Sequence, residues 1–317
     1  EGRGGGLRSQ FLLIILTSLI SFPLIAYGGA IGFPAVGSVA PIGIAMIFGA
    51  FLFGFGMMFG GGCGSGTLFT AGGGNTRMMI TLAAFIAGSL LGTFHLPWWQ
   101  SLPRMSGWSM IENFGPLGGL LFLTAILALI SWLTIVREKS LFGETQKSIR
   151  TGSYLRGPWS PMAGVIGIAT VGIATFLLLG RPWGITSGFA LWGAKIASLG
   201  GVDVANWPYW QNRSGLLERS VFSDATSVMN FGIMAGAMVA ATLAGNYSPS
   251  FRLTRVEFLT AILGGLLMGY GARLAYGCNI GAYLGGLVSG SLHGWVWMIA
   301  AFVGSALAIR IRSMAKF

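Results

Sequence analysis

Charged side chains are scarce in this sequence, because Asp, Glu, Lys and Arg make up only 9% of its 317 residues. A soluble globular protein carries about a quarter charged residues. Hydrophobic residues, in contrast, make up 54% of the chain, and the mean hydropathy is +0.74. The scarcity of charge therefore excludes an ordinary soluble domain and predicts an all-α polytopic membrane protein.

Acidic residues are the rarest charged type, with eight in the whole chain. All of them fall in tails, in loops or at the edges of apolar runs: Glu1, Glu112, Glu138, Glu144, Asp203, Glu218, Asp224 and Glu257. A cation pathway or a carboxylate proton relay needs an acid within a membrane span. The distribution argues against both and favours a site for an anion.

Cysteine is nearly absent as well, since Cys63 and Cys278 are the only two, far apart and each in apolar surroundings. Two such residues do not form a disulfide framework. The sequence has no C-x-x-C pair. It also has no G-x-x-x-x-G-K-[ST] motif, so it does not predict ATP hydrolysis at a phosphate-binding loop of that kind. We expect neither a metal nor a cofactor.

Long apolar runs dominate what remains. A membrane-spanning helix needs roughly 20 mostly apolar residues. Eight runs are predicted to cross, at about 11–30, 41–59, 78–96, 116–136, 159–180, 225–245, 257–274 and 294–309. Residues 183–199 are amphiphilic and are predicted to form a short re-entrant or interfacial helix, or a poor span. We expect a loop at 97–115, a longer loop at 200–224 and non-crossing segments after each cysteine.

The most polar stretch, about 137–158, predicts a cytoplasmic link between two halves of one transmembrane domain that covers residues 1–317. The halves are about 11–136 and 159–311. With eight crossings, most Lys and Arg residues fall on the side of the link and both termini, including Arg150 and Lys316. Cytoplasmic loops carry the excess of Lys and Arg, so both termini are predicted to be cytoplasmic. A crossing by residues 183–199 would weaken this bias.

One motif occurs twice. Residues 54–66 read GFGMMFGGGCGSG and residues 269–281 read GYGARLAYGCNIG, so both fit G-x-G-x5-G-C-x-x-G. In the expected crossing order the run before Cys63 goes inward and the run before Cys278 goes outward. The two copies are then antiparallel, and such an inverted-topology repeat places a substrate site at the interface between repeats, near the bilayer midplane. We therefore predict that two broken or re-entrant helices meet there.

The chemistry of the motif suits a soft anion. Glycine beside each cysteine is expected to break the helix, which the membrane tolerates only where the backbone is buried in protein or lines a cavity. A helix that restarts after the cysteine directs N–H groups at that cavity and favours an anion. Burial disfavours the thiolate, so both thiols are expected to be neutral, weak donors. The candidate substrate-binding and relay residues are Cys63, Cys278, Gly62, Gly64, Ser65, Gly66, Thr67, Gly277, Asn279 and Arg273.

Some of these residues have simpler explanations. Arg273 lies within an apolar run, where the first copy has Met58, and it is a candidate for substrate contact or for a helix end or snorkelling position. Asn279 fits a helix cap equally well. His95 and His293 lie at span edges and are predicted to be interfacial, as are the tryptophans.

The two copies, extended to GFGMMFGGGCGSGTLF and GYGARLAYGCNIGAYLGGLVSGSLHGW, closely resemble the YeeE/YedE family of membrane proteins. The segment RPWGITSGFALWGAK at 181–195 is similar to that family's middle part, and the resemblance covers most of residues 41–310. It implies thiosulfate uptake across the bacterial inner membrane, with S–H···S hydrogen bonds passing the anion between Cys63 and Cys278. Some members carry a further cysteine near the N-terminus, which this sequence lacks.

The leading hypothesis is thus a multi-pass inner-membrane transporter, not an enzyme, for thiosulfate. Its expected partners are the anion, membrane lipid and, as a candidate, a cytoplasmic sulfurtransferase. Nucleic acid is not expected, because the basic residues flank apolar runs rather than forming one patch. Three alternatives stay open: transport of another sulfur or selenium species, a membrane thiol oxidoreductase or sulfur transferase that uses both cysteines covalently, and an inert anchor for a soluble sulfurtransferase.

Overall fold

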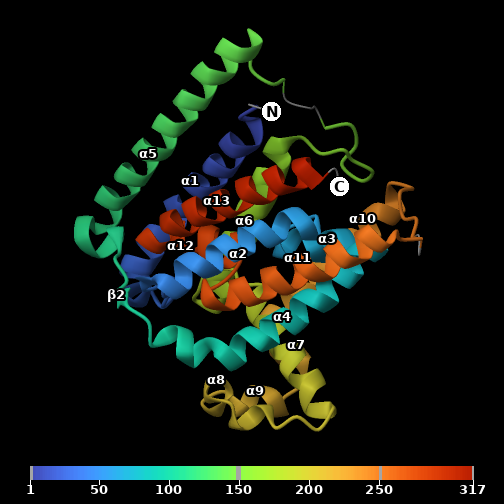
Figure 1. The fold of residues 1–317 in the computed structure, drawn as a ribbon. Coiled ribbons are helices and arrows are strands. Elements are labelled where there is room, and N and C mark those ends of the chain that lie inside the picture. The colour runs from blue at the N-terminus through green and yellow to red at the C-terminus, as the bar shows by residue number, and fades with distance from the viewer. Residues whose placement is uncertain (1–2, 148–150, 250–251, 316–317) are drawn as a thin grey trace. The chain divides into compact units, whose positions relative to one another are not determined.

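The chain is nearly all helical in the computed structural model, which describes residues 3–147, 151–249 and 252–315 (Figure 1). Glu1, Arg150 and Lys316, which entered the charge argument, lie outside the described residues. Eight helices in the described part are long and apolar enough to cross a membrane: Gly5–Ile31, Ile44–Gly72, Thr76–Gln100, Met110–Phe142, Pro161–Leu179, Ala225–Leu243, Arg255–Leu287 and Leu292–Met314. Each overlaps one predicted run, so the all-α polytopic membrane fold is confirmed.

The chain forms two compact units, and each unit takes segments from both halves of the sequence. The first unit comprises Glu1–Val39, Gly107–Trp183 and Leu284–Leu292. Its elements are α1 (Gly5–Tyr27), η1 (Gly28–Ile31), α5 (Met110–Phe142), α6 (Pro161–Leu179) and α12 (Gly285–Leu287). Within this unit α1 packs against both α5 and α6.

The second unit comprises Ala40–Ser106, Gly184–Tyr283 and His293–Phe317. It holds a two-stranded antiparallel pair, β1 (Ile42–Gly43) with β2 (Arg104–Met105). Its longer helices are α2 (Ile44–Gly60), α3 (Gly64–Gly72), α4 (Thr76–Gln100), α7 (Thr186–Leu199), α10 (Ala225–Leu243), α11 (Arg255–Leu274) and nearly all of α13 (Leu292–Ala315). Its short turns are η2 (Val204–Asn206), α8 (Pro208–Gln211), α9 (Ser214–Glu218), η3 (Val221–Ser223) and most of η4 (Asn279–Leu284).

A buried ion pair fixes the end of α5 in the first unit. Glu138 is fully buried, and its carboxylate lies 2.7 Å from Arg8 and 3.8 Å from Arg3. The backbone N–H of Gln146 donates to it at 2.8 Å. This acid therefore belongs to the last turns of a helix that continues to Phe142, rather than to a loop.

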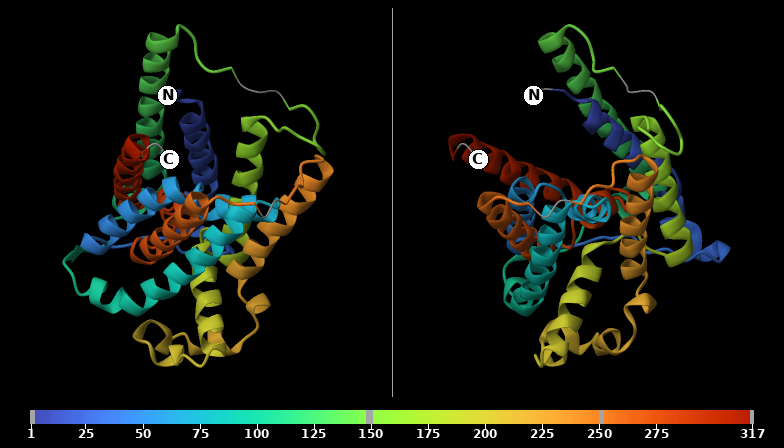
Figure 2. Two further views of the ribbon diagram at one scale, coloured as in Figure 1. Left: turned by 45° about the vertical axis from the view of Figure 1, so that its right-hand side comes forward. Right: turned by 90° about the vertical axis from the view of Figure 1, so that its right-hand side faces the viewer.

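Helices α2 and α11 approach at glycines in the second unit and lie side by side, with α4 along α11 (Figure 2). A methyl group on Gly49 would lie 2.7 Å from the Gly271 carbonyl oxygen, and one on Gly56 would lie 2.9 Å from that of Gly264. Real Cβ atoms do not come so close to other atoms, so a side chain at these positions would push the helices apart. Small residues at helix contacts are how backbones pack closely in lipid.

The contacts around these helices are reciprocal between the two motif copies. Ser305 on α13 donates to the Gly54 carbonyl at 2.9 Å, and Ser89 on α4 donates to the Gly269 carbonyl at 3.5 Å. Gly54 and Gly269 occupy the same position in the motif. Each motif helix therefore packs on the helix that follows the other copy.

The predicted loops contain more helix than the sequence suggested. α4 continues through Trp98 and Trp99 to Gln100, and residues 204–223 contain four short helical turns. The turn at residues 72–75 is confirmed, because α3 ends at Gly72 and Asn75 caps α4 by accepting from the Met78 N–H at 3.1 Å.

Two aromatic predictions are wrong. His293 is fully buried rather than interfacial, and Trp297 and Trp210 are 1% and 2% exposed rather than interface anchors. Their burial follows from contacts with residues that are distant in the sequence. Trp297 lies 5.4 Å from Phe53 between ring centroids, and the indole N–H of Trp210 donates to the Thr93 hydroxyl at 3.3 Å.

The close approach of α2 and α13 predicts that Gly54→Ala destabilises the fold. The new methyl group would overlap the Ala301 carbonyl, at a cost of about 1–3 kcal/mol. The matched control is Gly232→Ala on α10, where no atom lies within 4 Å of the added carbon. Thermal unfolding in detergent should show a midpoint several degrees lower for Gly54→Ala only, and equal midpoints for the two variants would contradict the packing.

Candidate functional site

The first cysteine stands at a break between two helices. α2 ends at Gly60, Gly61 adopts a left-handed conformation (φ 86°), and Cys63 is the N-terminal cap of α3. The Cys63 thiol accepts from the Gly66 N–H at 3.4 Å and lies 3.4 Å from the Ser65 hydroxyl. The predicted restart of the helix after this cysteine is confirmed, with a sulfur atom at its N-terminus.

The second copy breaks at the same place. α11 ends at Leu274, and Tyr276 and Gly277 both have positive φ values, of 63° and 151°. The fully buried Cys278 then begins the turns of η4, and its carbonyl accepts from the Ala282 N–H at 2.9 Å. The backbone N–H groups of Ile280 and Gly281 point to the Cys278 thiol. Gly281 is the counterpart of Gly66, so each thiol receives the same backbone donor.

The two copies meet in the second unit. A methyl group on Gly64 would lie 3.2 Å from the Cys278 sulfur and 3.3 Å from its Cβ. The residue next to one cysteine is thus in contact with the other cysteine. Both cysteines are free thiols.

Aromatic rings surround this meeting point. Phe85 lies 3.6 Å from the position of a Gly64 methyl group and makes edge contacts with Phe53 and Phe189, with centroid distances of 6.1 and 4.8 Å. Tyr283 stacks on Trp297 at 6.3 Å. Such a wall excludes water, which strengthens the weak hydrogen bonds inside it.

Arg273 lies one turn before the second break and is partly buried. Its guanidinium donates to the Tyr209 hydroxyl and to the Thr186 hydroxyl, both at 3.1 Å. Within the described part of the chain it has no carboxylate partner. The group therefore keeps its positive charge uncompensated beside the motif.

The other candidate residues are placed as follows. Thr67 is fully buried and donates to the Cys63 carbonyl at 2.8 Å, which is a structural role in α3. A carbon added to Gly62 would be in ordinary van der Waals contact with the backbone of Gly66 and Thr67, at 3.6 Å. Asn279 is partly buried, and its side-chain oxygen has no hydrogen-bond partner among the described residues.

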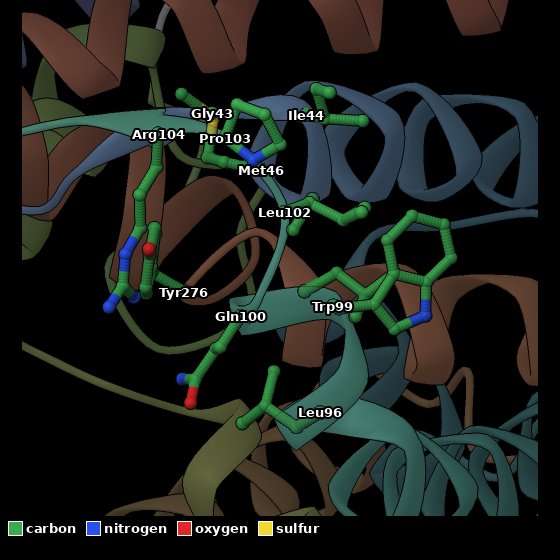
Figure 3. A pocket seen from close by; sticks show the side chains of 12 residues that line it. Gly43, Ile44, Met46, Leu96, Trp99, Gln100, Leu102, Pro103, Arg104 and Tyr276 are labelled. Atoms are coloured by element: carbon green, nitrogen blue, oxygen red, sulfur yellow. The ribbon is translucent and has the colours of Figure 1, made fainter.

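Sequence reasoning missed Tyr276 and Arg104. Arg104 donates a hydrogen bond to Tyr276, and in Figure 3 the two side chains lie beside each other at one end of a crevice. The crevice leaves about 10 Å³ for water centres, enough for about one water molecule. The sequence shows that Tyr276 occupies the motif position of Gly61. It does not show that Tyr276 has a positive φ, which is the feature that distinguishes this residue.

The side chains and backbone groups at the motif are thiols, hydroxyls and N–H groups. Within residues 3–147, 151–249 and 252–315, no three or more His, Cys, Asp or Glu side chains form a group that could hold a metal ion.

Comparison with known proteins agrees with this donor set. The family described as "Sulphur transport" matches residues 1–307. The chain belongs to this family. It is 27% identical to the "Thiosulfate transporter TsuA" of Spirochaeta thermophila over 262 residues, which are 77% of this chain and 70% of that protein.

The chain also matches two proteins named "Probable transporter YedE", at 33% identity in Escherichia coli and 31% in Salmonella typhimurium. Each match covers 159 residues, which are 50% of this chain and 39% of the relative. The matches thus cover less than half of these relatives. What the comparisons show of this chain is its membership of a family described as "Sulphur transport".

The contact between Gly64 and Cys278 predicts a disulfide. In Gly64→Cys, made together with Cys63→Ala, the Cβ atoms of residues 64 and 278 start 3.3 Å apart, close to the 3.5–4.5 Å of disulfides. Mild oxidation should link the two segments, as detected by mass spectrometry of the digested protein. The matched variant Gly62→Cys should not form this bond. If only the Gly62→Cys variant reacts with Cys278, the geometry of the site is wrong.

Proposed function

We propose that the protein takes up thiosulfate across the bacterial inner membrane through the constriction where Gly64 meets Cys278. The observation that carries the proposal is the contact between the two motif copies, each a helix break whose thiol accepts hydrogen bonds from the backbone N–H groups that follow it. The thiosulfate transporter among the relatives supports the choice of substrate.

The donors at the constriction suit transport because each of them is weak. A neutral thiol donates a weak hydrogen bond and has a polarisable sulfur atom. The terminal sulfur of thiosulfate is soft and carries negative charge, so it matches a thiol better than a hard oxygen does. Passage requires binding that is weak and shared over several sites, so that the anion can leave. In the proposed path Cys63 and Cys278 pass the anion on by S–H···S hydrogen bonds.

Arg273 supplies the charge that the constriction itself lacks. Its guanidinium is held by two neutral hydroxyls, and a methyl group added to Gly281 would lie 4.0 Å from the Cα atom of Gly184, two residues before Thr186. The arginine is thus near the second motif without a carboxylate to neutralise it. An arginine in a span is expensive and by default functional, so we assign it to anion attraction on the Cys278 side. Asn279, Ser65 and the glycines Gly62, Gly66 and Gly277 complete the proposed path.

The reciprocal contacts support the proposed inverted repeat. Ser89 with Gly269 and Ser305 with Gly54 are the pairs expected when two similar halves exchange places about a two-fold axis. The excess of Lys and Arg on the side of both termini supports a cytoplasmic position for them. On that side a cytoplasmic sulfurtransferase is the proposed acceptor of the substrate.

Removal of either thiol tests the transport path. Cys63→Ala and Cys278→Ala should each lower thiosulfate uptake at least tenfold in a sulfur-starved strain that lacks other thiosulfate uptake systems. Cys63→Ser and Cys278→Ser should keep part of the activity, because a hydroxyl still donates a hydrogen bond. Uptake of labelled thiosulfate into proteoliposomes checks the same variants without other cell components.

Three results would each contradict this assignment. Unchanged uptake in both alanine variants would remove the thiols from the path and leave an inert anchor. A persulfide or mixed disulfide trapped on Cys63 or Cys278 during turnover would favour covalent sulfur transfer. Faster uptake of a selenium anion or another sulfur anion than of thiosulfate would keep the path and change its substrate.

The role of Arg273 is tested separately. Arg273→Gln should raise the KM for thiosulfate about tenfold or more, because a hydrogen bond to a charged group contributes about 1.5–3 kcal/mol. Arg273→Lys should restore part of the affinity by restoring the charge. The control is Arg310→Gln at the exposed end of α13, which removes one charge elsewhere. Equal effects of Arg273→Gln and Arg310→Gln on KM would show that Arg273 acts only through net charge.

A further inference from the structure

A groove in the first unit is not used by the proposed transport path. It lies between the beginning of α1, the beginning of α6 and the residues that follow α5, and has a volume of about 630 Å³. α1 and α6 run side by side in this unit (Figure 2). The volume falls within the usual range of about 300–1,000 Å³ for a small-molecule site. Gly6 and Gly164 keep the groove open, because no atom lies within 4 Å of a carbon added to either.

The lining of the groove changes from polar to apolar along α1, and α6 contributes only apolar residues and glycine. Its polar end consists of Arg8, Ser9, Gln10, Gln146 and Lys147. Its apolar end consists of Leu12, Leu13, Val165 and Ile168, which lie further along α1 and α6. Both helices begin a membrane span at the polar end, so the apolar end lies deeper in the hydrocarbon. This gradient matches the headgroup and acyl chain of a lipid.

The polar end also carries excess positive charge. Arg3 and Arg8 share one buried carboxylate, that of Glu138. Lys147 lies 3.5 Å from Glu144, but both side chains are mostly exposed, at 85% and 64%. Such exposed pairs are weak, so the lysine remains available to another anion. Groups of Lys and Arg at the end of a span are typical of sites for anionic headgroups.

We propose that this groove binds one anionic phospholipid, with its phosphate near Lys147 and Arg8 and one acyl chain along Leu12, Leu13 and Ile168. The charge at the polar end selects an anionic over a zwitterionic headgroup. The apolar end selects a lipid over a free phosphate, which would leave those side chains uncovered. A lipid held here bridges α1, α6 and the residues after α5, and stabilises the first unit.

The test uses the full-length chain purified in detergent and stripped of lipid. Native mass spectrometry with added phosphatidylglycerol should show one tightly retained lipid per chain, and phosphatidylcholine should bind at least fivefold more weakly. Lys147→Gln should weaken phosphatidylglycerol binding about fivefold, since one basic residue near the surface contributes about that factor. Lys139→Gln, an exposed change of the same charge outside the groove, should leave binding unchanged.

A second pair of variants tests the groove itself. Gly164→Leu should abolish lipid retention by filling the groove, while Gly167→Leu should not, because only Gly164 lines the groove. The two variants are matched, since no atom lies within 4 Å of a carbon added to either glycine. Equal thermal midpoints without lipid would show that both glycine variants fold. If Gly164→Leu does not fold, Lys147→Gln tests the proposal in its place. Equal binding of phosphatidylcholine, or equal loss in Gly167→Leu, would overturn the proposal. The proposal would also be overturned if the unsubstituted chain forms a dimer that retains no lipid and that dissociates in Gly164→Leu. The groove would then bind a second copy of the chain.

Discussion

The glycine contact between α2 and α11 is the constraint on which the rest of the second unit depends. Gly49 faces Gly271 and Gly56 faces Gly264, so the two backbones approach more closely than side chains would allow. Because these helices end at the cysteine breaks, their spacing sets the distance between the copies. A wider spacing would move Gly64 away from Cys278 and open a gap that aromatic rings such as Phe85 could not close. The glycines at this contact therefore fix the width of the proposed constriction.

The helix breaks expose backbone groups that the membrane does not tolerate without partners. Each break solves this problem in the same way, because the thiol at the start of the next helix accepts an N–H from that helix, Gly66 for Cys63 and Gly281 for Cys278. The sulfur atoms thus stabilise the broken backbone as well as serving in the proposed path. A thiol that accepts through its lone pairs still has its S–H free to donate. Because the sulfur accepts a backbone N–H while its own S–H can still donate, a weak donor is compatible with a buried helix end.

Much of this could be predicted from the sequence, for identifiable reasons. The eight spans followed from hydropathy, and the helix break at each cysteine followed from flanking glycines. The burial of His293 and Trp297 could not, because it depends on rings elsewhere in the chain, those of Tyr276 and Phe53. The positive φ of Tyr276 was equally hidden, since non-glycine residues rarely adopt that conformation. Nor did hydropathy reveal that Glu138, in a polar stretch, is buried beside Arg8. Local composition predicts elements and breaks, but not partners that are distant in the sequence.

The differences between the two copies matter as much as their similarity. Where the second copy has Arg273, Tyr276 and Asn279, the first has Met58, Gly61 and Gly64. A fully symmetric constriction would bind an anion equally on both sides. Here Arg273 places a guanidinium within the second copy, whereas Arg77 and Arg312 reach the first copy from other helices and donate to the backbone carbonyls of Phe59 and Met58. In the proposed path the groups beside the two thiols therefore differ, and so does the strength with which each side holds the anion. The glycine framework thus keeps the two breaks together, while the substituted positions make the affinities on the two sides unequal. Unequal affinity does not by itself drive transport, but it determines which side of the proposed path the anion occupies for more of the time.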